Sequence, residues 1–170
     1  LYGDVIITKK PLDITDPEMK VKRNDRSEVV DLIIDDLNHA VENLPAFKEL
    51  TTEEEGRISK EGAQAFLSRV ALYEGTWQKS RNGNQNTQRS ANLLDIAAKA
   101  ARTVIDAKYG YTFRLFGTDS ETKILGDSAQ KYMFILENEK SNPAGIKKSS
   151  NHEYIFARRH DQVLASIGKN

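Results

Sequence analysis

The chain has 170 residues, of which 38% are hydrophobic and 29% are charged, and 25 basic residues balance 25 acidic ones. A chain of this length fits one domain and can bury a normal hydrophobic core. Its zero net charge provides no overall field that would attract nucleic acid or an anionic membrane surface. No apolar run approaches the roughly 20 residues of a membrane-spanning helix, and the absence of cysteine excludes disulfides and thiolate metal ligands.

The first predicted helix follows a segment, 1–24, that is expected to be extended. That segment contains a β-branched run and prolines, which disfavour helical dihedral angles. Asp25 and Glu28 then have the spacing of a capping box, in which each side chain satisfies a free backbone donor of the first turn. Apolar residues recur at intervals of three and four from there to Leu44, so we predict an amphipathic helix over 26–44.

Two further helices are predicted, over 60–78 and 90–108. Ser59 is the expected N-cap of the first of these, which is apolar around most of its circumference and should therefore pack on two sides. We expect it to end at Gly75-Thr76-Trp77, where its apolar pattern stops, and the other to end at Gly110. Antiparallel helices joined by loops predict stacked helical hairpins. The side chains expected to be buried between the first two helices are Ile33, Leu37, Phe66, Leu67 and Val70.

Residues 111–170 are predicted to form a loop-rich part of the chain. Asp127 is placed to cap one short helix, and the stretch 153–159 has the composition of a short extended segment. We therefore expect the whole chain, 1–170, to be one domain with a helical-hairpin scaffold at 25–110. The predicted fold class is all-α, with the alternation of alanine and bulky residues that tetratricopeptide-type hairpins also use.

Five stretches of the sequence together carry a resemblance to one protein family. They are GDVIITKKPLD, RNDRSEVVDLIIDDLNHAVENLP, GRISKEGAQAFLSRVALYEGTW, AAKAARTVIDAKYGY and NHEYIFARRH, in that order. From Gly3 to His160 the chain thereby resembles the SusD/RagB family of surface glycan-binding lipoproteins. Ile6 and Lys22 depart from the pattern, because the family often has proline there, and these departures affect only the rigidity of loops.

The resemblance implies a fold and a function that the periodicity of the sequence does not. The implied fold is a SusD-like α-α superhelix of tetratricopeptide-like hairpins with irregular loops laid over it. The implied function is non-catalytic capture of an oligosaccharide or polysaccharide at the cell surface and its delivery to a SusC-like TonB-dependent transporter of the outer membrane. In the family the chain continues on both sides, so the resemblance also implies an internal fragment, peripheral to the membrane and held there by a lipid anchor outside this chain.

Trp77, the only tryptophan, is the first candidate for carbohydrate binding. Its flat ring complements the apolar face of a pyranose, yet it also continues the helical stripe of Phe66 and Val70. This position favours a core role, in which the indole is mostly buried and contacts its own hairpin and the helix near 94–101.

The loop after the second helix supplies the other candidates for carbohydrate binding. Arg81, Asn82 and Asn84 carry guanidinium and amide groups, which bind sugar hydroxyls in pairs. The composition of this loop is more typical of a solvated turn, so the sequence favours that interpretation over a sugar site.

No residue pattern predicts catalysis, a metal site or a cofactor. His39 is four residues after Asp35 and is expected to pair with it on the helix surface. His152 and His160 flank an extended segment without a recognised metal-ligand spacing. The acidic residues lie in a run or on polar helix faces, and not on facing walls as glycoside hydrolysis requires. The alternative to glycan binding is a tetratricopeptide-like interaction scaffold that binds a peptide in its concave groove.

Overall fold

The structure is a computed structural model that describes residues 3–51, 54, 56–81, 87–136 and 140–157. Its helices are α1 (Arg26–Asn43), α2 (Lys60–Arg81), α3 (Thr87–Ile105) and α4 (Ala129–Met133). Short 3₁₀ turns occur at Pro17–Lys20, Phe47–Glu49, Lys123–Ser128 and Lys148–Ser150. Within these described residues there is no β-strand, only an isolated bridge between Val5 and Asn24. The all-α prediction is therefore confirmed.

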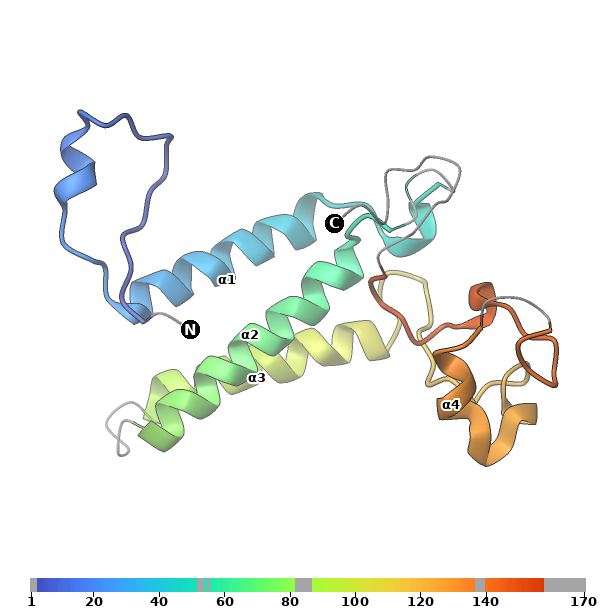
Figure 1. Cartoon of the computed structure of the whole chain (residues 1–170). Helices are drawn as coiled ribbons and strands as arrows, with labels where there is room; N and C mark the ends of the chain where they lie inside the picture. The colour runs from blue at the N-terminus through green and yellow to red at the C-terminus, as the bar shows by residue number, and fades with distance from the viewer. Residues whose placement is uncertain (1–2, 52–53, 55, 82–86, 137–139, 158–170) are drawn as a thin grey trace.

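The three long helices form two antiparallel pairs that share α2 (Figure 1). Because α2 packs against both α1 and α3, it needs small or apolar residues around most of its circumference. The predicted start of α2 is correct, but the helix continues beyond Trp77 to Arg81. The prediction that this helix ends at Trp77 is therefore wrong, while the hairpin architecture is confirmed.

The N-terminal segment is held at the first turn of α1. The backbone N–H of Asp25 donates to Glu28 Oε2 at 3.2 Å, which is one half of the predicted capping box. The free N–H of Arg26 donates to Asp4 Oδ1 at 2.9 Å, so the N-terminal segment supplies part of the cap. The chain between these contacts projects from the helix end as a loop that contains a 3₁₀ turn, so the segment is only partly extended (Figure 1).

The main core lies where the three long helices meet. Leu67 of α2 is 3% exposed, so its predicted burial is confirmed. Ala63 and Ala71 of the same helix are fully buried, and their small side chains let the neighbouring helices approach closely. The buried members of the apolar cluster are Val30, Ile34, Leu67, Leu93 and Ala100.

Two predicted core residues lie outside this core. Phe66 is 50% exposed and Ile33 is 37% exposed, so their predicted burial is wrong. Leu37 and Val70 are partly buried. Phe66 was predicted to be buried because it is apolar, but α2 lies between two helices. The residues of α2 that face these helices include small and polar side chains. They form a buried line that runs through Ala63, Leu67, Ala71, Glu74 and Gln78.

The start of α2 is joined to the loop-rich part of the chain. Ser59 Oγ accepts the N–H of Gly62 at 3.2 Å, which confirms the predicted N-cap. Glu61 Oε2 accepts the N–H of Phe47 at 2.7 Å. The ring of Phe47 in turn packs against Tyr111, with 4.6 Å between ring centroids. These contacts fix the connection before α2 and the segment after α3 against each other.

The α2 backbone lies directly against α3 at Gly75. A Cβ at this position would lie 2.9 Å from Leu94 Cγ and 3.2 Å from the Leu94 backbone nitrogen. Ser90 Oγ donates to the Gly75 carbonyl at 2.8 Å, and both residues are buried. The α2 backbone therefore approaches α3 closely at Gly75, and the helix does not end there.

We expect Gly75→Ala to lower the free energy of unfolding by about 1–3 kcal/mol, because the added methyl group overlaps Leu94 in a packed interface. Gly62→Ala in the same helix is the matched control. Its added Cβ would lie 3.1 Å from Ile58 Cγ1, on a side chain that is 45% exposed and can shift. Alanine at that position should be neutral or should stabilise the helix by up to about 1 kcal/mol. Equal effects of the two substitutions in urea denaturation would contradict this account.

A second, smaller core lies in the loop-rich part of the chain. α4 confirms the predicted short helix, but Asp127 lies in the preceding 3₁₀ turn and Ser128 is the N-cap. Asp119 Oδ1 accepts the N–H groups of Glu121 and Thr122 at 2.9 and 2.8 Å. Burial of Asp119 opposes its ionisation, but these hydrogen bonds outweigh it and hold the pKa of the carboxyl below its usual value. The buried members of this core are Phe116, Leu125, Ala129, Leu136 and Ile146.

Asn151 and Glu153, in the last described segment of the chain, hold the loop-rich part together. Asn151 Oδ1 accepts the N–H of Glu153 at 2.9 Å, which forms a local turn. Glu153 Oε2 then accepts the N–H of Phe116 at 2.8 Å. The described part of the predicted extended segment therefore forms no strand, and its role in the structure is to fix the neighbouring loop.

Candidate functional site

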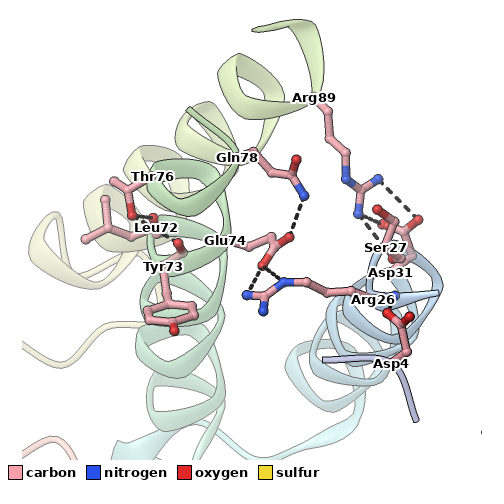
Figure 2. A network of polar contacts seen from close by, with 10 residues as sticks. All are labelled: Asp4, Arg26, Ser27, Asp31, Leu72, Tyr73, Glu74, Thr76, Gln78 and Arg89. Carbon is pink, nitrogen blue, oxygen red and sulfur yellow. Dashed lines mark hydrogen bonds and ion pairs between the residues drawn. The ribbon is translucent and has the colours of Figure 1, made fainter. Parts of the chain in front are cut away.

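One end of the helical hairpins combines two of the predicted site residues with a buried polar network. The first turn of α1, the last turns of α2 and the first turn of α3 lie close together there (Figure 2). Glu74 of α2 lies at the centre of the network, and only 1% of it is exposed. A carboxylate buried to this extent requires a cation or several hydrogen-bond donors nearby.

Arg26 of α1 supplies the cation. Its Nε and Nη2 lie 2.9 and 2.6 Å from Glu74 Oε2. Gln78 Nε2, one turn further along α2, donates to the other oxygen, Glu74 Oε1, at 2.7 Å. The hydrogen bond to Glu74 raises the pKa of Arg26 above its usual value. Both carboxylate oxygens are thus engaged: Oε2 holds α1 against α2 through Arg26, and Oε1 is bound within α2 by Gln78.

Trp77 lies beside this ion pair and is partly buried. The Arg26 guanidinium carbon lies 4.6 Å from the centroid of its ring. Tyr73, one turn earlier, stacks with the indole at a centroid distance of 6.3 Å and an interplanar angle of 23°. Cation–π and aromatic contacts of this kind hold the ring in place. The predicted packing of Trp77 within its own hairpin is confirmed, and its contact with 94–101 stays a prediction.

Arg81 is the second predicted site residue that the structure places here. It is exposed, and its guanidinium carbon lies 4.9 Å from the centroid of the Trp77 ring. Asn82 and Asn84 lie outside the described residues, so their part in a site stays a prediction. The geometry therefore brings Trp77 and Arg81 into contact on the surface of α2.

A second ion pair connects α3 to α1. Arg89 Nη2 lies 2.7 Å from Asp31 Oδ1, and its Nη1 lies 3.3 Å from Asp31 Oδ2 (Figure 2). The same Nη2 donates to the Ser27 carbonyl at 3.2 Å. Because Asp31 is half exposed, this pair adds little stability, but it fixes the orientation of both side chains.

Sequence reasoning missed Arg26, Glu74 and Gln78 as parts of the network. Two local features of the sequence could have indicated this network. Glu74 and Gln78 are polar residues four positions apart on a helix that is apolar over most of its girth. Arg26 places a positive charge in the first turn of a helix, where the helix dipole disfavours it unless a carboxylate is close.

The histidines do not form a metal centre in the described part of the chain. The side-chain amide of Asn43 lies 3.3 Å from His39 Nδ1, and among the described residues no hydrogen bond or ion pair joins His39 to Asp35, so their predicted pairing is wrong. The ring of His152 packs edge-on against Tyr111, with 6.3 Å between centroids, and His160 lies outside the described residues. Among the residues that the structure describes, no three histidine or acidic side chains are grouped as metal ligands. None of the described helices has both the length and the apolar character to cross a membrane.

Comparison with known proteins adds one finding to this geometry. No protein-family model and no curated protein matches the chain. Among solved structures, the chain is similar to a SusD-like protein from Bacteroides fragilis, with a TM-score of 0.58 and 27% sequence identity. The chain is SusD-like in fold. The match covers 91% of this chain, and the chain spans 22% of the length of the SusD-like neighbour.

Proposed function

We propose that this chain is part of a cell-surface protein that binds an oligosaccharide or polysaccharide without cleaving it. The observation that carries the proposal is the likeness to a SusD-like protein, at 27% identity over 91% of the chain. The five motif stretches occur in the family's order and support the same assignment. The central carboxylate of the site, Glu74, has both oxygens engaged by Arg26 and Gln78, which suits a structural role better than a catalytic one.

The surface of α2 beside the polar network has features that suit a sugar. Tyr73 is 52% exposed, so the part of its ring that does not face Trp77 can contact the apolar side of a pyranose ring. Arg81 lies next to the indole and can donate to ring hydroxyls. Asn82 and Asn84 would extend this surface with amide groups.

The proposed partner for delivery of the glycan is a SusC-like TonB-dependent transporter of the outer membrane. The proposed location is the outer surface of that membrane, with attachment through a lipid anchor outside this chain. Both proposals come from the resemblance to the SusD/RagB family. Co-purification of the intact protein with a transporter of this class, extracted from outer membranes in mild detergent, would support them. Recovery of the protein only from the soluble periplasmic fraction would contradict both.

Substitution of the exposed aromatic residues tests the proposed sugar-binding surface. We expect Tyr73→Ala to weaken retention of the intact protein in glycan-containing affinity gels by about tenfold. The stacking of a nucleic-acid base on an aromatic side chain contributes about 1–3 kcal/mol, and we take the low end of this range for a sugar ring. Phe66→Ala is the matched control, since Phe66 is a similarly exposed aromatic residue on the same helix and lies away from Arg81. Both variants should melt like the wild type. Equal retention of the two variants would contradict a sugar site at Tyr73.

Product analysis tests the proposed absence of cleavage. The intact protein, incubated with plant, host and microbial polysaccharides, should release no reducing ends. Steady release that disappears on substitution of one carboxylate of this chain would overturn the interpretation as a binding protein.

A peptide-binding scaffold is the second candidate, because several apolar side chains are exposed along α2. Phe66, Leu72 and Tyr73 are each about half exposed. A peptide that binds along this helix would lose affinity with Phe66→Ala and Tyr73→Ala alike. Loss of peptide binding in both variants, together with no retention by any glycan, would favour the scaffold over the glycan-binding protein.

A further inference from the structure

Two hollows lie on either side of α1. The first has a volume of about 480 Å³ and lies between α1 and the first turns of α3. The second has a volume of about 600 Å³ and lies between α1 and the N-terminal segment, from Ile7 to Asn24. Asp31 and Asp35 line both hollows, so the two meet over the same stretch of α1. Both hollows are more open than enclosed, so a ligand would lie along the surface of α1 and not inside a cavity.

The floor of the first hollow is apolar and fixed. Ile34 and Leu93 line it, and both belong to the buried cluster of the main core. Ile96 packs against that cluster and completes the floor. Side chains in a packed core keep their rotamers, so this surface does not have to reorganise when a ligand binds.

The rim of the first hollow carries polar side chains that are already oriented. Arg89 is held by its ion pair with Asp31. Gln88 Nε2 donates to Asn92 Oδ1 at 2.8 Å, and this bond orients the two amide groups. A rim of planar amide and carboxylate groups over an apolar floor matches a ring that has hydroxyls at its edge and C–H groups on its face.

Asp35 is the acceptor on the rim that remains available. It is exposed, and within the described part of the chain its side chain has no ion-pair or hydrogen-bond partner. Asn92 lines the same hollow from α3. An ionised carboxylate accepts several hydrogen bonds and an amide nitrogen donates two, so this pair can bind adjacent hydroxyls of one ligand.

The charge around the two hollows selects against an anionic ligand. The positive charge of Arg89 is neutralised by Asp31, which leaves Lys9 as the other cation of the lining. Glu18 is likewise paired, with Lys10 at 3.2 Å. Glu28 and Asp35 therefore outnumber Lys9 by one charge, and this small negative excess disfavours uronate or sulfate groups. The carboxylates that line the two hollows are Glu18, Glu28, Asp31 and Asp35.

From these observations we infer that the two hollows form one binding groove across α1 for a neutral, hydroxyl-rich chain, such as a neutral oligosaccharide. Asp35 accepts hydrogen bonds from ligand hydroxyls at the point where the hollows meet. Ile96, the partly buried apolar residue of the lining, contacts the apolar face of a sugar ring in the first hollow, and the second hollow takes the adjoining units. This inference rests on the proposed function and adds a site that is separate from the Tyr73 surface, together with the charge class of the ligand.

Calorimetric titration of the intact protein tests the groove. The neutral probes are maltohexaose, cellohexaose, xylohexaose and mannohexaose, and hexagalacturonate is the acidic probe of the same length. We expect at least one neutral probe to bind and Asp35→Ala to weaken it at least about tenfold, whereas hexagalacturonate does not bind. The matched control is Asp36→Ala, because Asp36 is the next exposed residue of α1 and lines neither hollow.

A second variant pair separates the groove from a general effect of charge. Asn92→Ala, on the opposite wall, should weaken the same neutral probe, and Asn38→Ala, an exposed asparagine outside both hollows, should not. If a neutral probe binds with the same affinity to the Asp35→Ala and Asp36→Ala variants, the inferred groove is not its binding site. The proposed function would still stand. If hexagalacturonate binds as tightly as the neutral probes, the inferred charge class is wrong. If no neutral probe binds, the inferred groove is wrong, and the proposed function falls with it only if the affinity gels retain the protein on no polysaccharide.

Discussion

Replacing Arg26 by alanine is expected to lower the free energy of unfolding by about 3 kcal/mol, because Glu74 then remains buried without its cation. Loss of one partner of a buried ion pair costs about 3–5 kcal/mol. The low end applies here, since the Arg26 side chain keeps 23% of its surface exposed while that of Glu74 keeps 1%. Urea denaturation at neutral pH measures the difference.

Arg81→Ala is the matched control for this prediction. Its guanidinium also lies over the Trp77 ring, but the side chain is exposed and belongs to the last turn of α2. Its removal should change the free energy of unfolding by no more than about 0.5 kcal/mol. If the two arginine variants were destabilised equally, the cation–π contact with Trp77 would be the stabilising interaction, and the Arg26–Glu74 ion pair would not.

Leu67→Ala should lower the free energy of unfolding by about 2–5 kcal/mol, because the side chain is buried among residues of all three long helices and its loss leaves a cavity. The small residues around it, Ala63 and Ala71, cannot move in to fill that space. Thermal melting followed by circular dichroism should show a clear drop in the melting temperature.

Leu72→Ala provides the comparison within the same helix. Leu72 is 52% exposed, so its truncation should have little effect on the stability of the isolated fold. A large loss for Leu72→Ala in the intact protein would mean that another part of the molecule covers this face of α2. A small loss for Leu67→Ala would contradict the location of the core.

The positions of the helices could be predicted because their signals are local. Capping residues such as Ser59 and the three-and-four spacing of apolar residues act within one helix, and they located α1, α2 and α3 to within a few residues. The end of α2 could not be predicted in this way. Glycine is a residue type that often ends a helix, but Gly75 is required here because Leu94 approaches the backbone closely. Packing against the neighbouring helices lets α2 continue to Arg81.

The burial of individual side chains depended on contacts that are distant in the sequence. The apolar stripe of α2 suggested that Phe66 faces the core, whereas the helix turns Leu67, Glu74 and Gln78 inward. Burial of Glu74 is possible only because Arg26 lies opposite it, and these two residues are 48 positions apart. No periodicity within α2 contains that information.

The candidate site was predicted in part for the same reason. Residue type and position on a helix end pointed to Trp77 and Arg81, and the structure places them in contact. The groove across α1 combines Asp35, Asn92 and the N-terminal segment, which come from separate parts of the chain. It exists only once the helices have packed, so single-sequence reasoning had no signal for it.

The central claim is that the protein binds a glycan and leaves it intact. The most direct test is an isothermal titration of the intact protein with the polysaccharide that its affinity gels retain best, followed by chromatography of the recovered sugar. The account predicts a saturable binding heat and a recovered glycan of unchanged length. Shortened sugar chains, or the absence of a saturable heat with every retained polysaccharide, would contradict it.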